Sequence, residues 1–287
     1  MVRKLVWVPV WVPVLLVSVL VLVGCGGCGA VGEQAVVTTD GGWSTTETVA
    51  DPMVRVAVID TGFSSRAIPQ ENMLPGQNYI QPQASTEDTF GHGTAMASVI
   101  LRYAPEAVLV PLVSSAYDRG RLSQVEPEVL AGMIRDAVDV YHCRIINISA
   151  GMVADEACVA EAVAYAEEQG ALIIAAAGND YKEKGETPYY PAAYDTVLAV
   201  GALDGEAVAD FSQRGEWVDV YAPGTDVTVL TISGNETTQT GTSCATARIC
   251  AGAVALLREN SAYTPAQLRQ LLLEQAKLLP EGGFGWQ

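Results

Sequence analysis

Short, strongly apolar runs alternate with longer amphipathic stretches from residue 53 onward. The apolar runs are rich in β-branched residues, which is typical of strands buried on both faces of a parallel sheet. The strands predicted in this way lie at residues 53–59, 108–113, 144–149, 171–177 and 196–200. Because helical stretches alternate with them, the pattern predicts an α/β fold of three layers, a mostly parallel twisted sheet with helices on both faces.

Helix signals separate the predicted strands. Ser123 and Glu126 have the spacing of a capping box, and the apolar positions that follow have the period of one helical face. Gly170 is a suitable C-terminal cap, and Thr264 with Gln267 forms a second capping box. The predicted helices cover residues 123–141, 155–169, 243–259 and the stretch from 265 onward.

The N-terminal segment has the pattern of an export signal. Arg3 and Lys4 precede an uncharged, apolar run over residues 5–24. Residues 22–25 (LVGC) resemble the lipobox of bacterial lipoproteins, in which cleavage leaves a lipid-modified cysteine at the new N-terminus, here Cys25. A run of this length can also span a bilayer, so an uncleaved helix is the alternative.

In both cases the basic residues stay inside and the remaining chain lies outside the membrane. We therefore expect a protein that is tethered to the outer face of a bacterial cell membrane. The expected division is a signal peptide over residues 1–24, a lipid-anchored linker over 25–52 and a folded domain over 53–287.

Composition and charge narrow the possible functions. The chain of 287 residues is 49% hydrophobic, which favours a packed core over disorder. Its formal net charge of −17 argues against a nucleic-acid partner, since nucleic acids attract positive charge. Of the six cysteines, five remain when Cys25 is set aside, so at least one thiol should be free or paired between chains.

Three polar residues stand where strands end or helices begin. Asp60 follows the first predicted strand, His92 lies in Gly91-His92-Gly93-Thr94, and Ser243 lies at the expected start of a helix. A serine hydroxyl becomes a nucleophile when an imidazole accepts its proton and a carboxylate orients that imidazole. Taken singly, each has a structural alternative: a turn residue, a core histidine and a helix N-cap. Together they are candidates for acyl transfer.

These three segments resemble the subtilisin-like serine proteases (the subtilases, peptidase S8). The order Asp, His, Ser is a property of that family. The resemblance extends over roughly residues 53–278 and includes four further segments, at residues 147–151, 176–179, 190–202 and 211–224.

The resemblance implies a subtilisin-like fold and a serine endopeptidase that needs no cofactor. It implies that Ser243 attacks the peptide carbonyl, His92 transfers the proton and Asp60 orients His92. Asn179 is implied as the side-chain donor to the oxyanion. The partner is then a peptide or protein substrate, and we expect the enzyme to be a monomer.

Substrate-binding positions follow from the same resemblance, with the substrate bound as an added strand. The expected residues are Ser149, Ala150 and Gly151 on one wall, Asp118, Arg119 and Gly120 on the opposing edge, and Asp180 and Tyr189 in the first specificity pocket. A tyrosine in that pocket fills space and an aspartate favours positive charge. We therefore expect a small or basic residue before the cleaved bond.

The sequence departs from the family pattern at several points. Ala247 stands where the family usually has proline, and Ser64 and Pro69 offer no carboxylate for the family's strong calcium site. We therefore expect no metal there. Residues 26–52 are too few for an inhibitory pro-domain of the usual kind. The alternative function is a catalytically silent lipoprotein that keeps the fold and binds peptides.

Overall fold

The computed structural model describes residues 53–118, 121–279 and 284–286. The expected signal peptide, the linker and Cys25 lie outside the described residues, as do Arg119 and Gly120. Within the described part of the chain, no helix is both long and apolar enough to cross a bilayer.

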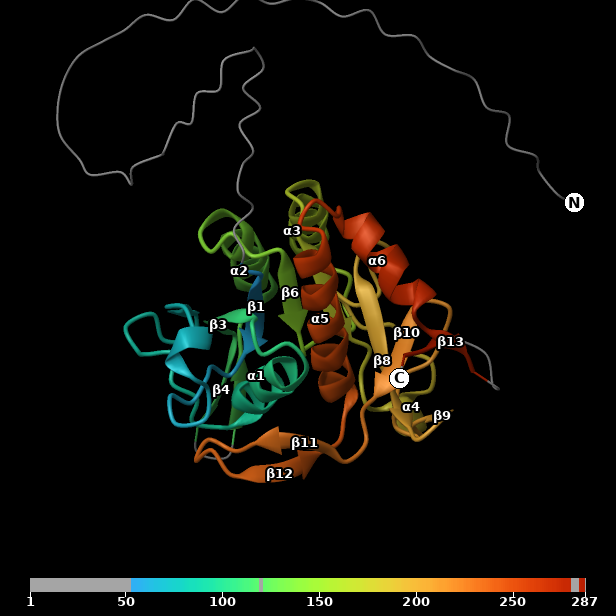
Figure 1. Ribbon diagram of the computed structural model, residues 1–287, viewed down its shortest axis with the longest axis horizontal. Helices are drawn as coiled ribbons and strands as arrows, with labels where there is room; N and C mark the ends of the chain where they lie inside the picture. The colour runs from blue at the N-terminus through green and yellow to red at the C-terminus, as the bar shows by residue number, and fades with distance from the viewer. Residues whose placement is uncertain (1–52, 119–120, 280–283, 287) are drawn as a thin grey trace, which may run out of the picture. The chain divides into compact units, whose positions relative to one another are not determined.

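A mostly parallel sheet forms the centre of the domain (Figure 1). Its strands are β1 (Arg55–Asp60), β2 (Gln77–Asn78), β3 (Val108–Val113), β6 (Ile145–Ile148), β7 (Leu172–Ala176), β8 (Leu198–Asp204), β9 (Ala207–Val208), β10 (Val220–Pro223), β13 (Lys277–Leu278) and β14 (Phe284–Gly285). The order across the sheet is β13-β14-β10-β8-β7-β6-β1-β3-β2. Every neighbour in this order pairs in parallel except β13 with β14, while β9 adds to β8 as an antiparallel strand.

Helices cover both faces of the sheet (Figure 1). One face packs against α1 (His92–Tyr103), α5 (Thr242–Glu259) and α6 (Pro265–Glu274), and the other against α2 (Pro127–Asp139) and α3 (Ala157–Glu168). Alternate residues of β1 serve the two cores: Val56 and Val58 face the α5 side, whereas Ala57 and Ile59 face the α2 side. This arrangement confirms the three-layer α/β prediction and explains why the strands are apolar throughout.

The predicted strands and the four predicted helices are present, with ends displaced by a few residues. The capping box at Thr264 and Gln267 is confirmed. The helix start predicted at Ser123 is wrong, because Ser123 lies in a strand and α2 begins at Pro127. A proline at the first helical position is already held near helical φ and needs no backbone partner, so it sets the start without a side-chain cap.

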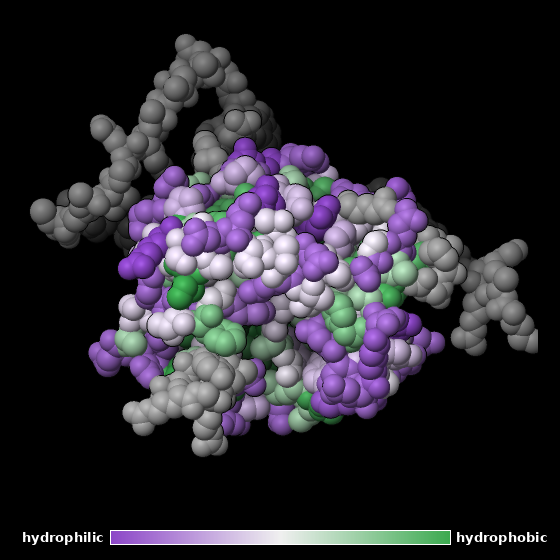
Figure 2. All heavy atoms as spheres, turned by 90° about the horizontal axis from the view of Figure 1, so that it is seen from below, coloured by the Kyte–Doolittle hydropathy of each residue, from purple (hydrophilic) through white to green (hydrophobic). Residues whose placement is uncertain are grey.

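Two antiparallel hairpins lie outside the main sheet. β4 (Ser115–Asp118) pairs with β5 (Arg121–Gln124) directly after β3, and β11 (Val227–Leu230) pairs with β12 (Glu236–Gln239) directly before α5. In Figure 1, the β11–β12 hairpin is seen below the sheet, on the side where the parallel strands end. On the face seen from that side, hydrophobic patches lie between wide hydrophilic areas (Figure 2).

Candidate active site

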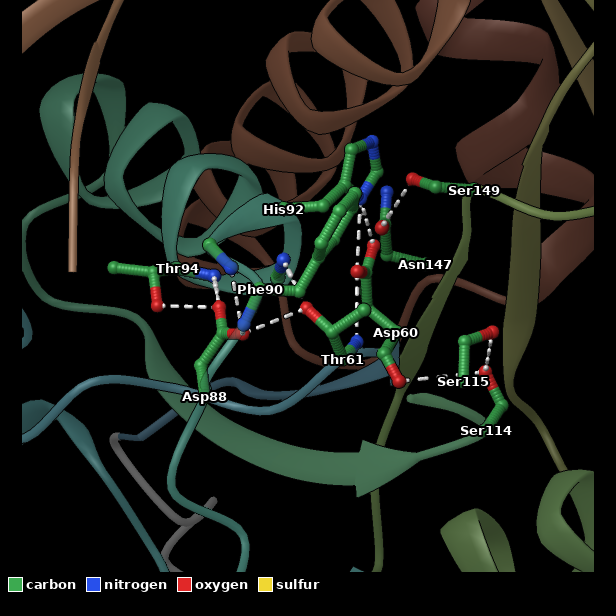
Figure 3. A network of polar contacts seen from close by, with 12 residues as sticks. Asp60, Thr61, Asp88, Phe90, His92, Thr94, Ser114, Ser115, Asn147 and Ser149 are labelled. Atoms are coloured by element: carbon green, nitrogen blue, oxygen red, sulfur yellow. Dashed lines mark hydrogen bonds and ion pairs between the residues drawn. The ribbon is translucent and has the colours of Figure 1, made fainter. Parts of the chain in front are cut away.

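Asp60 and His92 meet at the carboxyl end of β1. Asp60 is the last residue of that strand and His92 is the first of α1. The Nδ1 atom of His92 lies 2.8 Å from each carboxylate oxygen of Asp60 (Figure 3). Asp60 is buried and also accepts a 2.7 Å hydrogen bond from the backbone amide of Thr61. The carboxylate therefore holds the proton of the imidazole on Nδ1 and leaves Nε2 as the basic nitrogen.

The carboxylate also sets the proton affinity of this imidazole. The negative charge of Asp60 raises the pKa of His92 above 6.5, although burial of the ring opposes the shift. The hydrogen bond to Asp60 and the charge of Asp88 raise this pKa further. Since 30% of the side-chain surface of His92 remains exposed, a substrate can still reach the ring.

A second buried carboxylate, Asp88, organises the turn that leads into His92 (Figure 3). One of its oxygens accepts hydrogen bonds from the Thr61 hydroxyl and from the amides of Phe90 and Gly91, at 3.0, 2.9 and 2.8 Å. The other accepts from the amide and hydroxyl of Thr94, at 2.9 and 2.6 Å. Asp88 thereby ties the end of β1 to the first turn of α1.

The glycines of this region permit close packing of α1 on the end of β1. A Cβ atom at Gly93 would lie 2.3 Å from the carbonyl oxygen of Gly62, which no side chain tolerates. The amide of Gly93 instead donates a 2.9 Å hydrogen bond to the Thr61 hydroxyl. The glycine after His92 is therefore required for the Asp60–His92 contact.

Ser243 is the second residue of α5, the helix that packs against α1. The chain enters α5 through Gly241, whose amide donates a 2.8 Å hydrogen bond to the carbonyl of Gly224 beyond β10. Ser243 is buried, as is its neighbour Cys244. Burial raises the pKa of the Cys244 thiol to about 11, so this thiol is protonated at neutral pH.

Asn179 follows β7 and is fixed by the same helix start. Its Oδ1 atom accepts hydrogen bonds from the amide and the hydroxyl of Thr242, at 2.8 and 3.0 Å. The backbone amide can only donate, so the atom that faces it must be the oxygen. The Nδ2 group of Asn179 is thereby turned away from Thr242 and remains a donor beside the helix N-terminus.

Three hollows line the surface beside these residues. The Tyr189 hollow, of about 340 Å³, is lined by Gln124, Ser149, Ala150, Gly151, Ala176, Gly178, Asn179, Asp180, Tyr189 and Thr242. The Phe90 hollow, of about 150 Å³, is lined by Ile59, Asp60, Thr61, Phe90, His92, Ser114, Ser115, Gln124, Ser149 and Ala150. The Leu130 hollow, of about 160 Å³, is lined by Ile59, Ser114, Ser115, Gln124, Val125, Pro127, Leu130, Ile148, Ala150, Gly151 and Met152. Together they form a groove past the Asp60–His92 pair.

Comparison with known proteins identifies the chain. A family profile described as peptidase S8, the subtilase family, matches residues 51–286. The chain belongs to the subtilase family. Subtilisin BL of Lederbergia lenta is 32% identical over 237 residues, which cover 79% of this chain and 84% of that protein.

Solved structures agree with this membership. A cold-adapted subtilisin-like serine proteinase aligns with a TM-score of 0.70 and 25% identity over 81% of this chain and 87% of the other. The prenylagaramide maturation protease PagA aligns with a TM-score of 0.67 and 26% identity, over 81% of this chain and 86% of the other. The protein is thus a subtilisin-like serine endopeptidase with a subtilisin-like fold.

Some of the residues predicted to contact substrate line the groove of this subtilase and others do not. Ser149, Ala150 and Gly151 line the groove as a continuous wall after β6. Asp118 is the last residue of β4, in register with Arg121 of β5. Besides Ala150 of this wall, Gln124 of β5 lines all three hollows. Sequence reasoning missed Gln124, because no motif marks it and because a helix was predicted from Ser123, where β5 ends.

Asp180 and Tyr189, predicted for the first specificity pocket, line the Tyr189 hollow and contact each other. The Tyr189 hydroxyl, the Lys184 ammonium and the Gln213 amide all donate hydrogen bonds to the Asp180 carboxylate. Burial alone would raise the pKa of Asp180, but the bonds from Lys184, Tyr189 and Gln213 outweigh it and lower this pKa to about 2.

Metal-binding groups and disulfides complete the description. Among residues 53–118, 121–279 and 284–286, no three His, Cys, Asp or Glu side chains gather closely enough to hold a metal ion. The absence of a calcium site stays a prediction. The described cysteines, Cys143, Cys158, Cys244 and Cys250, are free thiols.

Proposed function

We propose that this subtilase hydrolyses peptide bonds through an acyl-enzyme on Ser243. The observation that carries the proposal is the pair of 2.8 Å contacts between His92 Nδ1 and Asp60, which fix the tautomer that leaves Nε2 free to accept the serine proton. The Ser243 oxygen attacks the scissile carbonyl while His92 takes its proton. His92 then protonates the leaving amine, and water releases the acyl group by the reverse sequence.

The developing oxyanion is stabilised by two donors at the start of α5. Asn179 is held through its oxygen by Thr242, so its Nδ2 group is oriented before substrate arrives. The second donor is the backbone amide of Ser243, where the helix N-terminus adds positive potential. Donors fixed in advance need no reorganisation during the reaction, which is what makes them effective.

The substrate lies as an extended strand between Gln124 and the Ser149–Gly151 wall. The residue before the scissile bond enters the Tyr189 hollow, next to Asn179. The Leu130 hollow accepts an apolar side chain farther along the strand, since its lining includes Ile59, Leu130 and Met152. Main-chain hydrogen bonds supply affinity, while the hollows supply selectivity.

The enzyme is tethered to the outer face of a bacterial membrane through a lipid on Cys25. Arg3, Lys4, the apolar run and the LVGC sequence support this part of the proposal. Detergent phase partition of the full chain should place it in the detergent phase. Cys25→Ser should remain as an uncleaved precursor, and mass spectrometry of the wild-type N-terminal peptide should find a diacylglyceryl cysteine. An unmodified Cys25 in a membrane-bound chain would instead indicate the uncleaved helix.

A fluorophosphonate probe tests the catalytic proposal on the full chain in detergent. We expect the wild type to be labelled and Ser243→Ala to remain unlabelled at equal thermal stability. Absence of label in a folded wild type would support the peptide-binding alternative. If the wild type is labelled, it should also cleave a peptide substrate, whereas Ser243→Ala should not. PagA is named as a maturation protease, and cleavage confined to few peptides would assign this chain a similar processing role.

A further inference from the structure

The Tyr189 hollow holds a carboxylate that is already occupied by a cation of the protein itself. Asp180 is the charged side chain among the described residues that line this hollow. It precedes the short helix α4 (Tyr181–Lys184), and Lys184, the last residue of that helix, contacts it through its ammonium group. The Lys184 Nζ atom lies 2.8 Å from Asp180 Oδ2 and 2.7 Å from the Tyr189 hydroxyl.

These contacts fill most of the hydrogen-bonding capacity of the Asp180 carboxylate. Oδ2 accepts from both Lys184 and the Tyr189 hydroxyl, and Oδ1 accepts from Gln213 Nε2 at 2.9 Å. A carboxylate oxygen has two lone pairs, so Oδ2 has none left for a further donor. Oδ1 keeps one lone pair, but a lysine or arginine of a substrate that approached it would meet the positive charge of Lys184.

We propose that Lys184 is a specificity-determining residue: its ammonium occupies the cation site of Asp180 and so makes the Tyr189 hollow select small, uncharged residues. The inference rests on the proposed function, because the hollow is assigned to the residue before the scissile bond. The sequence left a small and a basic residue open as preferences before the cleaved bond. The proposal decides between them, since Asp180 favours a basic residue only when Lys184 is removed.

Tyr189 limits the size of the residue that this hollow accepts. Its ring packs between two glycines of the walls: a Cβ atom at Gly151 would lie 3.2 Å from Tyr189 Cβ, and one at Gly178 would lie 3.0 Å from Tyr189 Cδ2. The hydroxyl bond to Asp180 holds the ring there. Loss of Lys184 leaves this bond in place, so it changes the charge of the hollow more than its shape.

Lys182, on the same helix, provides a matched control. Its ammonium pairs with Asp210 at 2.8 Å, and both side chains are well exposed, at 64% and 78%. The Lys184 side chain is 51% exposed, whereas its partner Asp180 is only 23% exposed within the hollow. Lys184→Met and Lys182→Met remove the same charge from the same helix, but only the former uncovers Asp180.

The test compares peptides that differ only in the residue before the scissile bond, which is Ala, Lys or Arg. We expect the wild type to prefer Ala, and Lys184→Met to raise the ratio of kcat/KM for Lys over Ala by about 10- to 100-fold. Lys182→Met should keep the wild-type ratio, as should Lys184→Arg, which retains the cation. Asp180→Asn in the Lys184→Met background should remove the gain.

An unchanged Lys-to-Ala ratio in Lys184→Met would overturn the proposal, as would a wild type that already prefers Lys or Arg. Fluorophosphonate labelling of each variant shows that its site is assembled. The same peptides can be titrated against Ser243→Ala forms of each variant by fluorescence anisotropy, with the same expected order of affinities. Binding without any hydrolysis by the wild type would refute the catalytic proposal while still deciding the role of Lys184.

Discussion

Asn179 and Thr242 are joined through a single oxygen: Asn179 Oδ1 accepts hydrogen bonds from both the amide and the hydroxyl of Thr242, at 2.8 and 3.0 Å. One residue follows β7 and the other begins α5, so the contact links two elements that are far apart in the chain. The amide nitrogen of Asn179 is the group left to act on substrate.

Replacement of Asn179 by leucine should lower kcat and leave KM nearly unchanged. The donor is needed where negative charge develops, so its loss raises the barrier without weakening ground-state binding. The expected loss is about 10²–10³-fold, which is the magnitude known for the corresponding asparagine of subtilisin. Steady-state kinetics on a peptide substrate measure it.

Thr242→Val is the matched variant for this prediction. It removes the hydroxyl that donates to Asn179 and accepts a 3.3 Å hydrogen bond from the Gly178 amide, and it keeps the amide bond of residue 242 to Asn179. The expected loss in kcat is therefore smaller, roughly threefold to tenfold, as for the loss of neutral hydrogen bonds away from the reacting atoms. An Asn179→Leu enzyme with wild-type kcat would show that the asparagine has no part in the reaction.

The acid limb of the rate profile should reflect the Asp60–His92 pair. Only neutral imidazole can accept the serine proton, and the charge of Asp60 raises the pKa of His92 above 6.5. A raised pKa keeps the ring protonated to a higher pH, so kcat/KM should fall as pH decreases through a midpoint above 6.5. Initial rates between about pH 5 and 9 determine the midpoint.

Asp60→Asn provides the contrast for this profile. It removes the charge that raises the pKa, so the remaining activity should have its acid limb at lower pH. It also allows the wrong tautomer, so kcat should fall by about 10⁴-fold, a value known for serine proteases of another fold. A wild-type midpoint at or below 6.5 would contradict the effect of Asp60 on the pKa of His92.

Asp88→Ala should destabilise the domain and reduce activity together. The substitution leaves the donors of Thr61, Phe90, Gly91 and Thr94 without their buried acceptor. We expect a loss on the order of 3 kcal/mol in unfolding free energy. For a domain of this size that corresponds to a fall in Tm of roughly 6–12 °C.

Thermal denaturation measures this effect, with Glu87→Ala as the control. The Glu87 side chain is exposed and accepts hydrogen bonds of 3.2 and 3.3 Å from the amide of Ser65, so its loss should change Tm by less than about 2 °C. Equal melting temperatures for Asp88→Ala and the wild type would show that the Asp88 network contributes no stability.

The sequence predicted the parts of this enzyme that local pattern determines. Strands such as β3 are apolar throughout because both faces are covered, and that pattern survives without knowledge of the partners. Asp60 and His92 were found because each stands at the end of an element in a glycine-rich context, and the resemblance to subtilases joined them to Ser243.

Long-range placement was beyond local pattern. Gln124 belongs to a short strand whose partner is another short strand, and its role arises only because the fold brings it and Ser149 to the same hollow. Lys184 stands four residues after Asp180, which is the spacing of a local ion pair on a helix, but no helix signal marks α4 in the sequence. What the spacing does not show is that Asp180 faces a pocket, since that depends on Tyr189 and on the wall after β6.

Arg144 provides a test of the scaffold at the amino-terminal ends of the strands, whereas the active site lies at their carboxyl ends. It directly precedes β6, and its guanidinium donates hydrogen bonds to the carbonyls of Gly170, Ser261 and Tyr263, at 2.8, 2.9 and 2.6 Å. These carbonyls belong to the turn after α3 and to the loop between α5 and α6. One side chain therefore joins helices that cover opposite faces of the sheet.

Arg144→Met should lower the unfolding free energy by about 2 kcal/mol, because it leaves partly buried carbonyls without a charged donor. Arg258→Met is the control, since Arg258 is exposed and its 3.5 Å pair with the half-buried Glu106 is long, so its loss should cost less than about 1 kcal/mol. Urea denaturation measures both. The rate of fluorophosphonate labelling per folded molecule should match the wild type in each variant, because neither arginine contacts the groove. A labelling rate that falls with Arg144→Met would mean that the α5–α6 loop also positions the start of α5, and the arginine would then act on Ser243 as well as on stability.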